Sequence, residues 1–243
     1  MENNNPNYVY ENVIQIDDAA ASRKFIANVF AWMFIALGIS AICAYWFAND
    51  QSLYSLLRDP VTGGNTGLGT IVMFAPLAFV LLMSFGLNRL SYPVLALLYV
   101  AYAAVTGMSL SFILFNFTAG SILSVFVSSS LLFGVMAIAG YTTHQDLTKF
   151  GSLMAMGLIG MIIATVVNLF LHSSGLDMAI AYIGVAVFIG LTASDTQKLK
   201  RIGAGLEYGD ATSKKYALMG GLTLYLDFIN LFLMLLRVFG RRR

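Results

Sequence analysis

The sequence has few charged residues and almost no cysteine. Asp, Glu, Lys and Arg make up 11% of the 243 residues and the mean hydropathy is +0.78, whereas an ordinary soluble domain is roughly 25% charged. This composition predicts an integral membrane protein, and the small net charge of +2 gives no indication of nucleic-acid binding. The single cysteine, Cys43, excludes disulfide frameworks and cysteine-based metal sites, and we expect it to be a small buried hydrophobe.

The N-terminal sequence lacks the features of a cleaved signal peptide. Its first residues, MENNNPNYVYENVIQIDDAAASRK, are polar and acidic, without a basic start and an early apolar run. We therefore expect the first apolar helix to remain as a membrane span. Residues 1–22 are predicted to form a mobile polar tail.

Long apolar stretches fill most of the remaining chain. Each is bounded by Gly, Pro, Asn or charged residues and is about long enough to cross a ~30 Å hydrocarbon core. Seven are predicted, at residues 25–47, 68–87, 92–115, 119–140, 151–171, 176–197 and 216–239. They predict a single all-α domain over residues 23–243, which is a polytopic membrane bundle of seven transmembrane helices.

Lysine and arginine are divided unevenly between the two sides of this bundle. Nine lie on the side of the N-terminus and five on the other side, including Arg241, Arg242 and Arg243. Because cytoplasmic loops carry an excess of Lys and Arg, we predict a cytoplasmic N-terminus and a C-terminus outside. The basic C-terminal tail favours the opposite placement of that end, which a six-span bundle with one re-entrant segment would allow.

The last apolar stretch carries an acidic residue, Asp227, near its middle. An Asp at the centre of a transmembrane helix costs roughly 2.5 to 3.5 kcal/mol, so such residues usually face the protein interior and find a partner. The candidate partner is Asp195, near the inner end of the sixth stretch. Asp195 would lie about 7 to 8 Å and Asp227 about 16 Å along their helices from the same side. A kink, a tilt or a longer sixth helix must close that gap if the two carboxylates meet.

A pair of carboxylates in a low-dielectric interior has defined chemistry. The two cannot both stay ionised at close range, so they share a proton and can act as a pH sensor. The doubly ionised pair suits transient binding of calcium, with oxygens of Thr192 and Asn230, one turn away on the two helices, as supporting ligands. The alternative is that each Asp has its own partner, Lys198 for Asp195 and Asn230 or a backbone group for Asp227.

Arg89, at the inner end of the second stretch, is the best basic counter-charge for the pair. Its alternative role is that of a positively charged anchor that reaches the lipid head groups.

Four sequence stretches resemble the Bax inhibitor-1 family, also called the transmembrane Bax inhibitor motif family, and in particular its bacterial inner-membrane members. They are TGMSLS at 106–111, GYTTHQDL at 140–147, ASDTQKLK at 193–200 and LTLYLDFINLFLMLLRVFG at 222–240. The resemblance implies that the last helix is central and wrapped by the other six. It also implies a pH-sensitive pore that leaks calcium, gated by an aspartate pair that corresponds to Asp195 and Asp227, with Arg89 as the matching arginine. Ser194 departs from the family, which commonly has tyrosine there, so no aromatic role beside the pair carries over.

Three function classes follow. The leading prediction is a pH-sensitive, calcium-permeable leak channel of the bacterial inner membrane, with calcium, protons and membrane lipid as partners, no cofactor and no enzymatic activity. The second is a regulator or binding partner of a membrane protease or stress pathway, which would use the polar tail. The third, an intramembrane aspartyl protease, is less favoured because Leu224, Tyr225 and Leu226 give Asp227 no glycine-rich approach for a substrate strand.

Overall fold

The computed structural model describes residues 18–206 and 209–242. Within these ranges the chain forms eight helices, seven of which are long and apolar enough to cross a membrane. The helices are α1 (Asp18–Asn49), α2 (Gln51–Leu57), α3 (Gly67–Gly86), α4 (Tyr92–Asn116), α5 (Ala119–Thr142), α6 (Thr148–Leu171), α7 (Ser174–Ala204) and α8 (Ala211–Phe239). The predicted all-α polytopic membrane bundle of seven spans is confirmed.

Several helices extend beyond the apolar stretches that predicted them. α1 begins at Asp18, so residues 18–22 of the predicted tail are helical, while residues 1–17 lie outside the described residues. α7 continues to Ala204 and α8 begins at Ala211, both through turns rich in Lys and Arg. The length of an apolar stretch indicates only the part of a helix that lies in the hydrocarbon core. The helical hydrogen bonds continue into the polar turns beyond that part.

The short helix α2 was not predicted from hydropathy. Asp50 precedes it, and its carboxylate accepts hydrogen bonds from the backbone N–H groups of Ser52 and Leu53 at 2.8 and 3.2 Å. These two bonds satisfy donors that have no partner within the helix, which is the ordinary role of an N-terminal cap.

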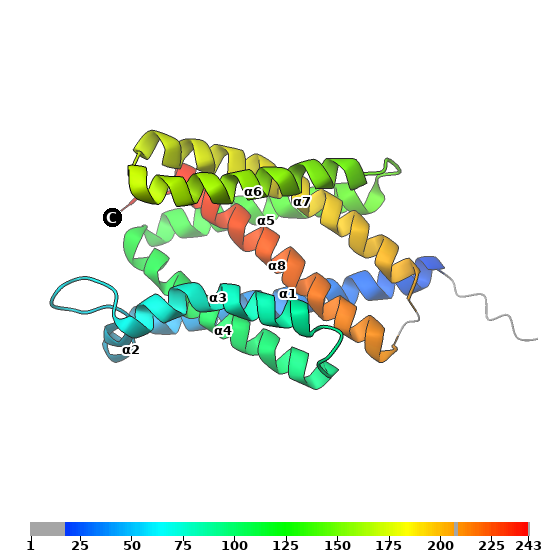
Figure 1. Cartoon of the computed structure of the whole chain (residues 1–243), viewed down its shortest axis with the longest axis horizontal. Coiled ribbons are helices and arrows are strands. Elements are labelled where there is room, and N and C mark those ends of the chain that lie inside the picture. The colour runs from blue at the N-terminus through cyan, green and yellow to red at the C-terminus, as the bar shows by residue number, and fades with distance from the viewer. Residues whose placement is uncertain (1–17, 207–208, 243) are drawn as a thin grey trace, which may run out of the picture.

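Helix α8 runs diagonally between two groups of helices, with α1, α3 and α4 on one side and α5, α6 and α7 on the other (Figure 1). It is the most deeply buried of the seven spans. It packs against α1, α4, α5 and α7, whereas α3 packs mainly on α4 and α6 packs on α7. The implied wrapping of the last helix by all six others is therefore not confirmed, because α3 and α6 form outer layers.

The start of α1 and the end of α8 lie at opposite ends of the bundle (Figure 1). Near the start of α1, the Ser22 hydroxyl donates a hydrogen bond to the carbonyl of Lys200 at 2.9 Å. At the other end, Thr118 N–H donates to the carbonyl of Arg241 at 3.1 Å, and Arg241 N–H donates to the hydroxyl of Ser121 at 3.0 Å. This arrangement follows from an odd number of spans that each cross once.

Close packing fixes the position of α7 against α5. A Cβ atom added to Gly140 would overlap the backbone carbonyl of Ala193. Small residues allow helix backbones to approach where no hydrophobic effect drives helices together in lipid. Gly140 thus brings α5 against the part of α7 that carries Asp195.

Candidate functional site

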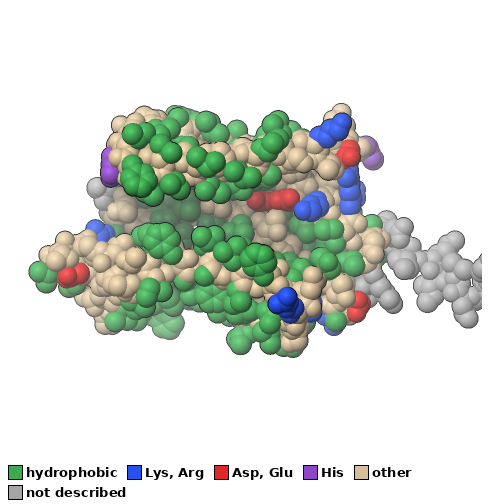
Figure 2. Space-filling view, viewed as in Figure 1, with side chains coloured by type: hydrophobic (Ala, Val, Ile, Leu, Met, Phe, Trp, Pro, Cys, Tyr) green, Lys and Arg blue, Asp and Glu red, His purple; other side chains and the backbone are tan. Residues whose placement is uncertain are grey.

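A cavity of about 1140 Å³ lies between α3 and α4 on one side and α6, α7 and α8 on the other. Figure 2 shows this face hollowed between two bands of apolar side chains, with acidic side chains inside the hollow. The walls are mainly aliphatic and methionine side chains, and the carboxylates come from α7 and α8. A concave, largely apolar space with a few convergent polar groups is the usual form of a ligand site.

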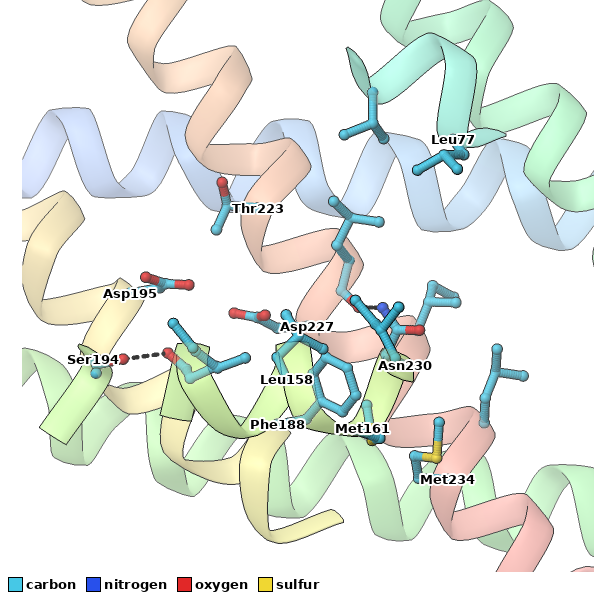
Figure 3. A pocket seen from close by; sticks show the side chains of 18 of the residues that line it. Leu77, Leu158, Met161, Phe188, Ser194, Asp195, Thr223, Asp227, Asn230 and Met234 are labelled. Carbon is cyan, nitrogen blue, oxygen red and sulfur yellow. Dashed lines mark hydrogen bonds between the residues drawn. The ribbon is translucent and has the colours of Figure 1, made fainter. Parts of the chain in front are cut away.

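Asp227 lies on the cavity side of α8. Its neighbours Leu224, Tyr225 and Phe228 are buried in the core, so the side chain of Asp227 faces the cavity (Figure 3). The residue is only 5% exposed, and its Oδ2 atom has no hydrogen-bond partner among the described residues. A buried polar atom without a partner typically costs about 1 to 3 kcal/mol, so a hydrogen-bond donor at Oδ2 would stabilise this arrangement.

Asp195 of α7 lines the same cavity, and Figure 3 shows its carboxylate turned toward that of Asp227. Asp195 lies nine residues before the end of α7, and Asp227 lies sixteen residues after the start of α8. The longer α7 and the diagonal course of α8 together reduce the difference in depth that the sequence implies (Figure 1).

Among the described residues, neither aspartate side chain forms an ion pair or a hydrogen bond of its own. Lys198, one turn after Asp195, lines the cavity and is exposed, but the ion pairs of the described chain do not include these two residues. Asn230 lines the cavity as predicted, yet its amide nitrogen donates to the carbonyl of Leu226 at 2.8 Å and not to Asp227. The alternative of separate partners therefore has no support for Asp227, whereas for Asp195 it rests only on the nearby charge of Lys198.

The other predicted supporting residue, Thr192, is not at the cavity. It is buried, and its hydroxyl donates to the carbonyl of Phe188 in its own helix at 2.7 Å. Thr223 lines the cavity instead, one turn before Asp227 on the same face of α8 (Figure 3). The spacing of four residues from Asp227 was the sequence signal that could have identified it.

Arg89 is not brought to the aspartate pair. Helix α3 ends at Gly86, so Arg89 lies in the turn before α4, where its side chain is exposed. The α3 residues that line the cavity come from the middle of that helix, between Met73 and Val80. The position of Arg89 fits the anchor role at the end of the bundle rather than the role of a counter-charge.

A polar network joins the C-terminal part of α7, just after Asp195, to residues 143–147, which connect α5 to α6. The side-chain amide of Gln197 accepts a hydrogen bond from Leu147 N–H at 2.8 Å and donates one to the carbonyl of Gln145 at 2.7 Å. The guanidinium of Arg201 donates to Gln197 at 3.0 Å and pairs with Asp146 at 2.8 Å. Sequence reasoning missed this network, although both partners lie in or beside the stretches at 140–147 and 193–200.

The network also sets the ionisation of Asp146. Hydrogen bonds from the hydroxyl and backbone N–H of Thr148, followed by the bond from Arg201, lower the pKa of Asp146 to about 2. Asp146 is therefore ionised at neutral pH, and its charge is neutralised by Arg201. Gln197 lies two residues after Asp195, so the network fixes the helix that carries one of the two cavity carboxylates.

A second buried network positions α8. The Ser40 hydroxyl donates to the carbonyl of Ala103 at 2.7 Å, and it also lies 2.7 Å from the hydroxyl of Tyr225. Since Ser40 has one hydroxyl hydrogen, Tyr225 must be the donor in the second bond. The three residues tie α8 to α1 and α4 on the side away from the cavity.

Comparison with known proteins places the chain in a family. It matches the family described as inhibitor of apoptosis-promoting Bax1 over residues 22–243. It is 44% identical to inner membrane protein YbhL of Escherichia coli K12, over 94% of this chain and 96% of that protein. A protein of Rickettsia prowazekii is 43% identical over 91% of each chain, and a membrane protein of Streptococcus pyogenes serotype M3 is 32% identical over 95% and 98%. Because these matches span nearly the whole sequence, the chain belongs to the Bax inhibitor-1 family of membrane proteins.

Proposed function

We propose that this protein is a pH-sensitive, calcium-permeable leak pathway gated by Asp195 and Asp227. The observation that carries the proposal is the Oδ2 atom of Asp227, which is buried without a partner from the described part of the chain, in a cavity that Asp195 also lines. A shared proton would supply the missing hydrogen bond. The chain belongs to the Bax inhibitor-1 family, and the resemblance of its sequence motifs to that family implies the same role.

Protonation controls the gate in this proposal. At low pH the pair holds a proton, and α7 and α8 stay together. At high pH both carboxylates ionise and repel each other, and as a general scale two unit charges ~4 Å apart interact by about 4 kcal/mol at an effective dielectric constant of 20. A bias of that size shifts a two-state equilibrium by roughly a thousandfold. The other charged groups at the cavity are Lys198 and Arg201, and Arg201 is engaged with Asp146.

Calcium is the permeant ion in this proposal and not a resident cofactor. In the part of the chain that the structure describes, no group of three or more His, Cys, Asp or Glu residues could hold a metal. Calcium prefers six to eight oxygen ligands. Two carboxylates with the side-chain oxygens of Thr223 and Asn230 provide a weak site, which suits passage of the ion.

Calcium flux into liposomes, measured between pH 5 and pH 8, tests the proposal. We expect the wild-type flux to rise with pH, and Asp227→Asn or Asp195→Asn to abolish that dependence. Asp59→Asn, in the exposed connection between α2 and α3, is the matched control and should behave as wild type. A double Asn variant with unaltered flux and pH dependence would refute the gate. A wild-type protein that carries no calcium at any pH would favour the regulatory alternative.

We also propose that the protein lies in the bacterial inner membrane with its N-terminus in the cytoplasm. The name of the Escherichia coli relative supports the inner membrane, and the excess of Lys and Arg at the N-terminal end of the bundle supports the orientation. Alkaline phosphatase fused after Arg243 should be active in a bacterial host, while a fusion after residue 206, in the connection between α7 and α8, should be inactive. The reverse pattern of activities would show that the orientation is opposite to the one proposed.

A further inference from the structure

The cavity opens sideways, toward the hydrocarbon of the bilayer. Its lining includes the middle of α3 and the facing part of α6, two helices that pack on α4 and α7 and leave a hollow between them (Figure 2). Most of the exposed lining residues at this opening are apolar, namely Met73, Leu77, Ile162 and Val166, and the exposed Thr165 is the polar residue among them. Because these residues belong to membrane-spanning segments, a molecule dissolved in the bilayer can reach the cavity between α3 and α6.

The interior of the cavity combines apolar walls with acceptors that lack donors. Leu158, Met161 and Phe188 form part of the wall beside Asp227 (Figure 3). Asp227 is buried with Oδ2 unpaired among the described residues, and Asp195 faces the same space. The cavity of about 1140 Å³ is much larger than a metal ion and its lining is largely apolar, so its size and chemistry also fit a larger ligand than calcium. That ligand should carry an apolar chain and a cationic hydrogen-bond donor.

The two cationic residues at the cavity, Lys198 and Arg201, do not remove this preference for a cationic ligand. The guanidinium of Arg201 is engaged by Asp146, Gln197 and Thr148. Lys198 is exposed and lies one turn beyond Asp195, toward the end of α7. The deep part of the cavity therefore presents carboxylate oxygens, which a protonated amine can satisfy with up to three N–H donors in charge-assisted bonds.

We propose that this cavity binds a single-chain amphipathic amine that enters from the bilayer between α3 and α6. Its ammonium group contacts Asp227 and Asp195, and its hydrocarbon chain lies along the apolar walls toward Leu77. The site requires the cavity and its carboxylates but does not require that the protein conducts calcium.

Native mass spectrometry of the full chain in detergent micelles tests the proposal with three probes of equal chain length: hexadecylamine, hexadecanol and hexadecyl phosphate. We expect one amine per chain, bound at least tenfold more tightly than the alcohol or the phosphate. Asp227→Asn should weaken amine binding at least tenfold, while Asp59→Asn leaves it unchanged. Equal binding of amine and alcohol, preference for the phosphate, or no binding of the amine would each overturn the proposal.

A second pair of variants tests the route of entry and does not alter the buried carboxylates. Leu77→Trp should fill the opening and weaken amine binding at least fivefold. Leu82→Trp, on the same helix at an exposed position that does not line the cavity, is the control and should bind as wild type. Unchanged binding in a folded Leu77→Trp protein would refute entry between α3 and α6. Because the readout is binding, it separates this proposal from the calcium-flux proposal.

Discussion

Arg201 at the end of α7 pairs with Asp146 of the connection between α5 and α6, with 2.8 Å between the guanidinium nitrogen and the carboxylate oxygen. Both side chains are largely exposed, and solvent-exposed ion pairs are individually weak. The pair nevertheless belongs to a network with buried members, because the same guanidinium group of Arg201 donates to Gln197. The ion pair therefore acts with Gln197 to hold this connection against α7.

The contribution of Asp146 to stability should depend on pH. Its pKa is lowered from the ordinary value of 3.8 to about 2, so the folded state favours the ionised form. The contribution is complete above pH about 4 and is lost as the pH falls through about 2. Thermal unfolding of the wild type and Asp146→Asn in micelles should show a difference in Tm at pH 6 that closes near pH 2. A difference that persists at pH 2 would contradict the ionised role of Asp146.

Gln197→Ala should destabilise the protein, because Gln197 is buried and its side chain makes hydrogen bonds to two backbone groups. Gln197 is 6% exposed and bonds both Leu147 and Gln145, so its removal leaves backbone groups unpaired at a cost of about 1 to 3 kcal/mol. The free energy of unfolding from detergent titration measures this cost. Lys198→Ala, at the exposed neighbouring position, should change it by less than about 0.5 kcal/mol. Equal effects of the two substitutions would show that the network does not stabilise the fold.

Ser40→Ala should be more damaging than Tyr225→Phe. Loss of Ser40 removes the bond to the Tyr225 hydroxyl and the additional bond to the Ala103 carbonyl, and we expect a loss of about 1 to 3 kcal/mol in the free energy of unfolding. Tyr225→Phe leaves the bond to Ala103 intact and should cost about 0.5 to 1.5 kcal/mol. Tyr45→Phe, at an exposed position, is the control. The reverse order of the two effects would contradict the assignment of Tyr225 as the donor.

The sequence predicted the features that depend on local composition. The seven spans follow from apolar length, and Asp227 stands out because a carboxylate is costly at that depth. The cavity itself depends on α3 standing apart from α6, which is a relation between distant helices. Arg89 is a second feature that depends on the arrangement of the helices and could not be placed from the sequence. Its charge suggested a partner for the aspartates, but the end of α3 at Gly86 places it in an exposed turn.

The contacts of Gln197 and Ser40 could not be predicted for a related reason. Apart from Arg201, which bonds Gln197 from one turn away, their partners lie 50 or more residues away in sequence and are backbone groups or a tyrosine hydroxyl. Backbone donors and acceptors are present at nearly every residue, so sequence carries no signal of which of them a side chain will meet. Only the packing of the helices selects them.

Gly140→Ala should disturb the site through the backbone, although residue 140 does not line the cavity. The added Cβ would overlap the carbonyl of Ala193, so α5 and α7 must separate, at a cost of about 1 to 3 kcal/mol. Because Ala193 precedes Asp195 by two residues, the separation moves a cavity carboxylate, and both calcium flux and amine binding should change. Gly134→Ala on the same helix is the matched control, since a Cβ there meets no atom within 4 Å. Unfolding and binding measurements on both variants decide the matter: equal behaviour would show that the contact between α5 and α7 does not position Asp195.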